Sequence, residues 1–307
     1  MTDVLERVRA TGVLTGSPVV VLLSGGRDSV CLLDCAVQLA PQVTALHVNY
    51  GLRGEADADE AFCRELCDGL ALPLEVHRAR RPADSGNLQG WAREVRLAQA
   101  RTLAADRGAL VATGHTATDQ AETILYRLAA SPGRRALLGM SERDGVVIRP
   151  LLTVSRDETA EHNRERCLPW REDPTNASDV FARNRVRNEL VPALERIHPA
   201  AQRNVVRTAQ LLRDEAEVLD GVVDTALAGR DRIALATLAA LPPALARLVI
   251  RRLAEDATGG MCARAATRLD EILALADGKL DLGDGVRAVV EHGILRMVPT
   301  PPLRTHA

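Results

Sequence analysis

A short run of small polar residues, Ser24–Ser29, has the composition of an anion-binding loop. It reads Ser-Gly-Gly-Arg-Asp-Ser and follows five β-prone apolar residues, so its setting predicts a strand, a tight loop and a helix. Gly25 and Gly26 allow the backbone to approach a ligand closely, while serine hydroxyls and the free N–H groups of a helix start offer hydrogen bonds to an anion. The run therefore predicts a phosphate cradle.

Neither of two common phosphate-binding motifs fits this run. A Walker A loop requires Gly-Lys-Ser/Thr, and a dinucleotide fingerprint requires three spaced glycines, and the run contains neither. On the two glycines alone, an ordinary turn between a strand and a helix is an equal alternative, with Asp28 placed favourably against the helix dipole.

Two pairs of charged residues, each three positions apart on a predicted helix, could also do chemistry. Asp119 and Glu122 face the same side of their helix and could hold magnesium or an amine. The spacing from Thr116 to Asp119 fits a capping box equally well, so Asp119 also has a purely structural interpretation. Arg93 and Arg96 could grip phosphates, with a solvated helix face as the alternative.

A basic strip lies between residues 183 and 213, where seven arginines stand against two glutamates. Such a strip can attract a polyanion, although a solvated amphipathic helix is the simpler alternative. Aromatic residues make up only 2% of the chain, so we do not expect bases stacked on rings to be the main mode of nucleic-acid contact.

The elements that must position these residues alternate between strands and helices through the first half of the chain. This alternation is typical of βαβ units and of a parallel, doubly wound α/β sheet. The expected strands are 19–23, 43–48, 72–77, 109–113 and 146–148. Such sheets bind ligands beyond the carboxyl ends of their strands, which points to the loops 24–29, 49–53 and 114–123.

The second half of the chain is predicted to be mainly helical. Ser155–Glu158 carries a capping-box signature, a long helical region spans about 181–227, and 228–231 is a candidate hinge. We therefore divide the chain into a larger domain, 1–215, and a small C-terminal domain, 216–307.

The small C-terminal domain is expected to be of the α+β type. Helices are predicted around 244–255 and 263–276, followed by two short strands, 279–282 and 286–298. Gly283–Gly285 between those strands suits a hairpin turn.

Length and composition fit a globular protein of about two domains. No apolar run is long enough to cross a bilayer, and the first residues lack a signal pattern, so we expect a cytoplasmic protein. The six cysteines include no C-x-x-C pair. The pairs Cys31/Cys35 and Cys63/Cys67, each four residues apart on a predicted helix, indicate core packing in a reducing compartment rather than a metal site.

The run Ser-Gly-Gly-x-Asp-Ser after a buried strand resembles the PP-loop of the N-type ATP pyrophosphatases. Those enzymes cleave ATP between its α and β phosphates and adenylate a substrate. The resemblance implies that Ser24, Gly25, Gly26 and Ser29 cradle the departing pyrophosphate, with Asp28 near its Mg²⁺.

Further stretches in the same order resemble the tRNA(Ile)-lysidine synthase family. They are 47–53, 92–96, 114–123, 149–152, 171–176, 183–187 and 190–194. The resemblance implies that ATP adenylates O2 of the wobble cytidine in tRNA(Ile) with a CAU anticodon, and that the ε-amine of free L-lysine then displaces AMP. The modified tRNA would read AUA instead of AUG.

The same resemblance implies a role for each matching residue. The implied ATP ligands are Ser24, Gly25, Gly26, Arg27, Asp28, Ser29, Asn49, Arg53 and His115. The implied catalytic residues are Asp28, Asp119, Glu122 and Arg93, with Mg²⁺ at Asp28 and Asp119. The implied tRNA ligands are Arg96, Arg183, Arg185 and Arg187. Domain 1–215 would be catalytic and 216–307 would bind tRNA, with no membrane partner and with a homodimer as one option.

The chain departs from the family pattern at three places. Thr118 stands where Asp is usual, Tyr50 stands where His is usual, and 130–133 reads Ala-Ser-Pro-Gly instead of Arg-Gly-Ser-Gly. Thr118 removes one carboxylate from the expected magnesium and lysine region. Two competing functions are a PP-loop tRNA thiolase, whose relatives use the C-x-x-C pairs that this chain lacks, and a non-catalytic RNA-binding paralogue.

Overall fold

The computed structural model describes residues 3–52, 54–81, 88–130, 134–172 and 182–301, without the side chains of Gln89 and Arg183. It divides the chain into two compact units, Met1–Leu212 and Arg213–Ala307. Their boundary lies within one long helix, α10 (Ala201–Leu227). In the described ranges, no helix has both the length and the hydropathy that a bilayer crossing requires.

The first unit is built on a six-stranded sheet with the order β3-β2-β1-β4-β6-β5. Its strands are β1 (Val19–Leu22), β2 (Val43–Asn49), β3 (Leu74–Arg78), β4 (Leu110–Ala112), β5 (Arg143–Asp144) and β6 (Val147–Ile148). All neighbours are parallel except the short edge strand β5, so the predicted parallel α/β fold and its five strands are confirmed. The strand order reverses between β1 and β4.

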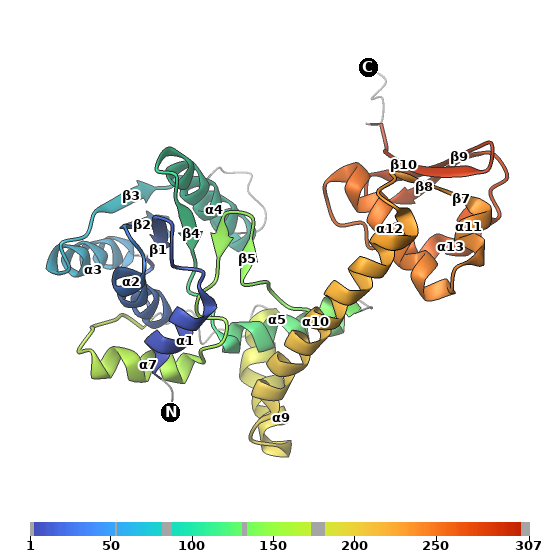
Figure 1. The fold of residues 1–307 in the computed structure, drawn as a ribbon. Coiled ribbons are helices and arrows are strands. Elements are labelled where there is room, and N and C mark those ends of the chain that lie inside the picture. Colours follow the sequence, from blue (N-terminus) through green and yellow to red (C-terminus); the bar gives the residue numbers. More distant parts are fainter. Residues whose placement is uncertain (1–2, 53, 82–87, 131–133, 173–181, 302–307) are drawn as a thin grey trace. The chain divides into compact units, whose positions relative to one another are not determined.

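Helices cover both faces of this sheet (Figure 1). The helices that contact the strands are α2 (Arg27–Leu39), α3 (Ala56–Gly69) and α4 (Leu88–Asp106). The other helices of this unit before α8 are α1 (Val4–Thr11), α5 (Ala117–Ala130), α6 (Arg134–Leu137) and α7 (Arg156–Glu165). Every residue of β1 is buried, and alternate side chains point to opposite faces. Val19 and Val21 join the core under α2, whereas Val20 and Leu22 join the core that includes α4. The central strand is therefore apolar on both faces.

Helix α7 packs against α2, and hydrogen bonds and an ion pair fix its N-terminal end. Ser155 caps it, and both hydrogen bonds of the predicted capping box with Glu158 are present. Arg7 of α1 pairs with the same Glu158 at 2.5 Å and also donates to the Thr153 carbonyl. Helices α1, α2 and α7 therefore pack against one another.

The long helical region predicted for 181–227 is interrupted in the structure. It consists of α8 (Ala182–Arg185), a π-helical turn η2 (Val186–Leu190), α9 (Val191–Ile197) and α10. π-helical turns are rare and are frequent at functional sites, so the turn that carries Arg187 is notable.

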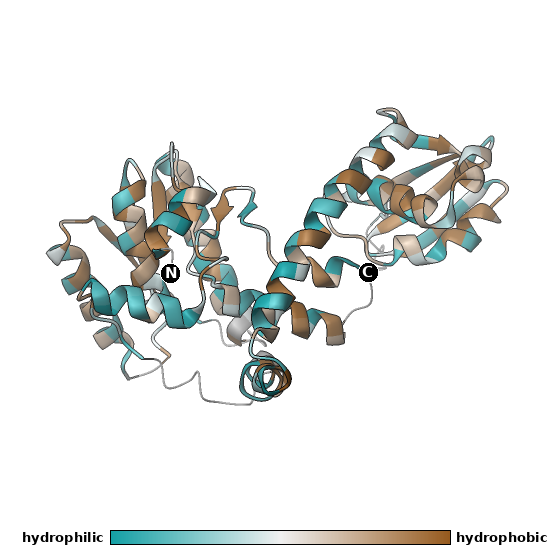
Figure 2. Ribbon diagram, turned by 60° about the horizontal axis from the view of Figure 1, so that its bottom comes forward, coloured by the Kyte–Doolittle hydropathy of each residue, from teal (hydrophilic) through white to brown (hydrophobic). Residues whose placement is uncertain are grey.

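The second unit contains a four-stranded antiparallel sheet, β7-β10-β9-β8, with helices packed on it. Its elements are β7 (Arg232–Ala234), α11 (Leu235–Ala240), α12 (Pro243–Thr258), η3 (Ala265–Arg268), α13 (Leu269–Leu273), β8 (Gly278–Gly283), β9 (Val286–Glu291) and β10 (Ile294–Pro299). In each unit the helices alternate hydrophilic and hydrophobic residues along their length (Figure 2), as amphipathic helices do.

One strand prediction for this unit is wrong. The expected strand 286–298 is two strands, because His292 (φ 52°) and Gly293 (φ 71°) both adopt left-handed conformations and form a two-residue hairpin turn. The hairpin at Gly283–Gly285 is confirmed by the pairing of β8 with β9.

Because α2 begins within the Ser24–Ser29 run, its packing sets the position of that run. We expect Leu33→Ala, at a side chain only 1% exposed, to lower the free energy of unfolding by about 2–5 kcal/mol. Val37→Ala on the same helix, where the side chain is 38% exposed, should change it by no more than about 0.5 kcal/mol. Urea denaturation followed by circular dichroism measures both, and equal effects would contradict this account of α2.

Candidate active site

A cavity of about 750 Å³ opens at the carboxyl ends of β1, β2 and β4. Open α/β sheets bind ligands at this position, where the strand order reverses. The predicted site residues that line the cavity are Ser24, Gly26, Arg27, Asp28, Ser29, Asn49, Arg93, Arg96, His115, Asp119 and Arg187. Gly25, Glu122 and Arg185 are not part of the lining. Arg53 and the side chain of Arg183 fall outside the described residues.

The Ser24–Ser29 run forms the tight loop that its composition predicts. The Ser29 hydroxyl donates to the Gly26 carbonyl (2.8 Å) and accepts from the Ser24 amide (3.2 Å). The hydroxyls of Ser24 and Ser29 are 3.1 Å apart. Gly25 has φ 81°, and a Cβ there would lie 3.1 Å from the Phe62 ring. The loop therefore requires glycine at this position and presents two hydroxyls at the start of α2.

Asp28 is held by side chains from α7. The Thr159 hydroxyl donates to its Oδ1 at 2.6 Å, and Arg156 Nε lies 3.3 Å from its Oδ2. Burial nevertheless raises the pKa of Asp28, and the nearby charge of Asp119 raises it further. The structure thus keeps a carboxylate in a place where its charge is poorly compensated.

Asp119 has both of the interpretations that its spacing allowed. Its Oδ2 accepts hydrogen bonds from the Thr116 amide and hydroxyl, each at 2.9 Å, and its own amide bonds back to that hydroxyl at 3.3 Å. Asp119 therefore completes a capping box with Thr116, the residue before α5, and it also lines the cavity close enough to Asp28 to affect that residue's pKa. Two converging carboxylates offer the hard oxygen ligands that Mg²⁺ prefers, so this pair fits a divalent cation.

Glu122 is fully buried and binds Arg187 in a two-pronged ion pair. Arg187 Nε and Nη2 donate to its two carboxylate oxygens at 2.5 and 2.9 Å, and Arg187 also lies 3.6 Å from Asp119. Burial acts to lower the pKa of Arg187, but the bonds to Glu122 raise it above its usual value. Glu122 therefore positions Arg187 at the cavity wall instead of reaching the cavity itself.

Asn49 and its neighbours organise the loop after β2. The Asn49 amide donates to Asp57 and to Glu60, each at 3.0 Å, while its oxygen accepts from the Gly51 amide at 2.9 Å. Hydrogen bonds from Arg78, together with those from Asn49 and Arg64, lower the pKa of Glu60 to about 2. The loop at the cavity rim is thus held by an ionised, buried carboxylate.

The helix that carries Arg93 and Arg96 is anchored by Tyr50. Its hydroxyl donates to the Ala92 carbonyl (3.0 Å), and its ring contacts Trp91 edge-on at 5.8 Å. Tyr50 therefore packs against α4 and helps to aim both arginines at the cavity. His115 lies at the end of β4, where its Nδ1 is 2.8 Å from the Thr113 hydroxyl.

The sequence did not reveal how basic the cavity is. Eight arginines line it against five acidic residues. Those not singled out from the sequence are Arg101, Arg149, Arg156 and Arg171. They come from separate elements, so no spacing rule connects them. The available signals were the position of Arg156 directly after the capping residue Ser155, and the place of Arg149 and Arg171 at the start of two stretches that resemble the family.

Thr118 has no part in the cavity lining. Its hydroxyl accepts from the Arg156 amide (3.2 Å) and lies 3.4 Å from Gln202 Oε1. Thr118 therefore contacts the start of α7 and does not line the cavity beside Asp28 and Asp119.

The sheet topology, with a tight, hydroxyl-bearing loop at its switch point, is typical of α/β nucleotide-binding domains. The family model described as "PP-loop domain" matches residues 3–194, so the chain belongs to the PP-loop family.

Within that family, its similar curated relatives are tRNA(Ile)-lysidine synthases. The chain is 39% identical to that of Solibacter usitatus, covering 80% of this chain and 58% of the relative. It is 36% identical to that of Thermus thermophilus, covering 93% and 57%. It is 38% identical to that of Symbiobacterium thermophilum, covering 94% and 66%. The chain therefore spans less than two thirds of each of these relatives, and the resemblance seen in the motifs is confirmed.

A solved structure shares the fold at much lower identity. The U34-tRNA thiolase NcsA from Methanococcus maripaludis superposes with a TM-score of 0.57 at 18% identity, covering 68% of this chain and 78% of that one.

The ion pair between Glu122 and Arg187 should matter strongly for stability. Arg187→Ala leaves a fully buried carboxylate without its partner, and we expect this to cost about 3–5 kcal/mol in urea unfolding. Arg185→Ala, at an exposed position two residues earlier, should cost at most about 0.5 kcal/mol. Adding Glu122→Gln to Arg187→Ala should recover part of the loss. Equal stability of the two arginine variants would contradict the pairing.

The raised pKa of Asp28 predicts the sign of a pH effect. A carboxyl that binds its proton more tightly when folded contributes stability below its unfolded pKa, and this is lost as the pH rises through the folded pKa. We therefore expect Asp28→Asn to melt at a higher temperature than the unvaried chain at neutral pH, with the difference shrinking as the pH falls through the pKa of Asp28.

Asp34 provides the matched control with the opposite sign. Burial acts to raise its pKa, but hydrogen bonds from His162 and Arg166 hold it below its usual range. Asp34→Asn should therefore lower the melting temperature at neutral pH. Thermal melts of both variants across the acid range measure this, and a shift of the same sign in both would refute it.

Proposed function

We propose that this chain ligates free L-lysine to C2 of the wobble cytidine of tRNA(Ile) with a CAU anticodon, at the expense of ATP. The observation that carries the proposal is the cavity itself. Its lining includes the hydroxyl-bearing loop at the start of α2, the carboxylates of Asp28 and Asp119, and eight arginines. The cavity lies where the strand order of the sheet reverses. The names of the curated relatives support lysine and this tRNA as the other two substrates.

In the first step, O2 of the cytosine attacks the α-phosphorus of ATP, and the bond to the β-phosphate breaks. The Ser24 and Ser29 hydroxyls and the N-terminus of α2 hold the departing pyrophosphate. Asp28 and Asp119 would hold Mg²⁺, which would neutralise further phosphate charge. Arg93, Arg96 and Arg156 line the remaining wall, where forked guanidinium groups suit phosphate oxygens.

In the second step, the ε-amine of lysine attacks C2 of the adenylated cytosine, AMP leaves, and the amine loses a proton. Adenylation makes this possible because it converts a poor leaving oxygen into a good one. The chain's own contribution is positioning and charge stabilisation. Glu122 acts here through Arg187, which it holds against the cavity beside Asp119.

The tRNA contacts are proposed from charge and exposure. Arg185 is exposed beside the cavity residue Arg187, and Arg183 belongs to the same run of arginines. We propose that this run receives the phosphates of the anticodon stem and loop, and that the second unit, with 216–307 as its predicted extent, also binds tRNA.

The test follows labelled lysine into nucleosides. Full-length protein, ATP, Mg²⁺ and labelled L-lysine are incubated with a CAU-anticodon tRNA, and the digested nucleosides are analysed by mass spectrometry. We expect labelled cytidine, with AMP and pyrophosphate released in equal amounts. Asp28→Asn should lower the rate at least about 100-fold, since a neutral amide cannot hold a metal-bound pyrophosphate as a carboxylate does.

A tRNA with the wobble cytidine replaced by uridine is the substrate control and should remain unlabelled. Binding of the CAU tRNA without any labelled cytidine would support a non-catalytic RNA-binding function. Undiminished AMP release by Asp28→Asn would remove Asp28 from the reaction.

A further inference from the structure

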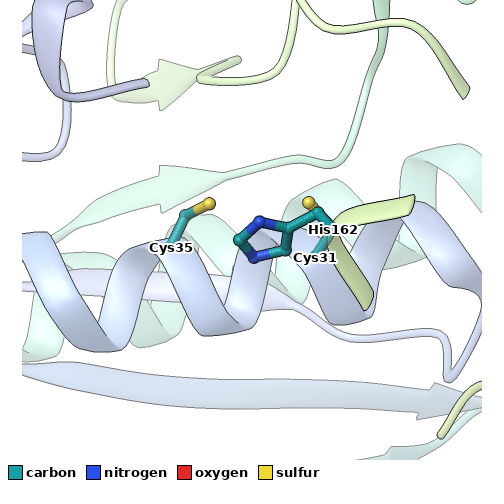
Figure 3. Close-up of side chains that lie close together, drawn as sticks. All are labelled: Cys31, Cys35 and His162. Atoms are coloured by element: carbon teal, nitrogen blue, oxygen red, sulfur yellow. The ribbon is translucent and has the colours of Figure 1, made fainter. Parts of the chain in front are cut away.

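A second group of potential metal ligands lies outside the cavity, in the core between α2 and α7. It consists of Cys31 and Cys35 on α2 and His162 on α7, whose ligand atoms all lie within 4.8 Å of one another. Figure 3 shows the His162 ring beside α2, between the two sulfur-bearing side chains. Both cysteines are fully buried and His162 is 5% exposed. The cysteine spacing alone suggested only packing, because His162 comes from a helix far along the chain.

The imidazole is oriented in the way that metal-binding histidines usually are. His162 Nε2 lies 2.8 Å from Asp34 Oδ2, and Asp34 also accepts hydrogen bonds from Gln38 (2.8 Å) and Arg166 (3.2 Å). Because Nε2 is engaged with this carboxylate, Nδ1 is the ring nitrogen available to a metal ion. A carboxylate behind the distal nitrogen is the common second contact of a metal-bound histidine.

We propose that Cys31, Cys35 and His162 bind one zinc ion. Zn²⁺ with two thiolates and a neutral imidazole carries no net charge, which a buried site requires, whereas Cu⁺ with the same ligands would leave a negative charge in the core. Tetrahedral coordination at Zn–S and Zn–N distances of about 2.3 and 2.0 Å places ligand atoms roughly 3.5–3.8 Å apart, so the cluster needs to contract by about 1 Å. Binding releases the two thiol protons to solvent.

The position of the cluster gives the ion a structural purpose. Cys31 lies one helical turn after Asp28, and His162 lies one turn after Thr159, which donates a hydrogen bond to Asp28. A zinc ion here would clamp together the two helices that hold that carboxylate. Because the unfolded chain lacks the assembled site, the free energy of zinc binding adds to the stability of the fold.

The experiment measures the metal content of the full-length protein expressed with added zinc and dialysed against metal-free buffer. We expect about one zinc per chain by elemental analysis, and fewer than about 0.1 in Cys31→Ala/Cys35→Ala. The matched control is Cys63→Ala/Cys67→Ala, a fully buried pair with the same spacing on α3, which should keep its zinc. In the unvaried protein, replacement by Co²⁺ should give a thiolate-to-metal charge-transfer band that the first double variant lacks.

Two results would overturn the proposal. One is that the protein without substitutions, shown by circular dichroism to be folded, contains no zinc and does not melt at a higher temperature after refolding with zinc. This result does not depend on whether the double variant folds. The other is zinc retained in full by Cys31→Ala/Cys35→Ala. Asp34→Asn should weaken zinc binding about 10–100-fold, which separates a site oriented by Asp34 from adventitious thiol binding.

Discussion

The site depends on a buried carboxylate whose charge is only partly balanced. Asp28 sits at the start of α2, receives a 2.6 Å hydrogen bond from Thr159, and lies 3.3 Å from Arg156. Its pKa is still raised, because burial and Asp119 outweigh these partners. Folding therefore disfavours the charged form of Asp28 relative to the unfolded chain. A cation bound beside Asp28 would offset this cost, so the arrangement favours cation binding there.

This arrangement explains why α7 is as much a part of the site as the loop after β1. Its capping box and the pairing of Glu158 with Arg7 hold its first turn, from which Arg156 reaches the cavity. The same helix reaches α2 again through His162 and Asp34. Polar contacts thus join α2 and α7, so a displacement of one helix should move the other.

A second constraint is the ion pair between Glu122 and Arg187. Glu122 is fully buried, and Arg187 reaches it from a π-helical turn. This contact changes the meaning of two residues. The sequence predicts Glu122 as a catalytic residue and Arg187 as a tRNA ligand. In the structure Glu122 binds Arg187, and of the two only Arg187 lines the cavity. Spacing along α5 correctly placed Asp119 and Glu122 on neighbouring turns, yet only Asp119 faces the cavity.

The local patterns of the sequence determined the parallel α/β sheet, the loop Ser24–Ser29, the capping box at Ser155 and the family, because each depends on residues close together in the chain. The left-handed turn at His292 and Gly293 escaped those patterns, since its residues also suit a continuous strand. Tertiary structure alone decided that Asn49 holds Glu60, that Glu122 holds Arg187 and that His162 meets Cys31 and Cys35. Those contacts join residues of different elements, which meet only when the chain folds. Spacing rules apply within one helix or strand, so they cannot predict such contacts.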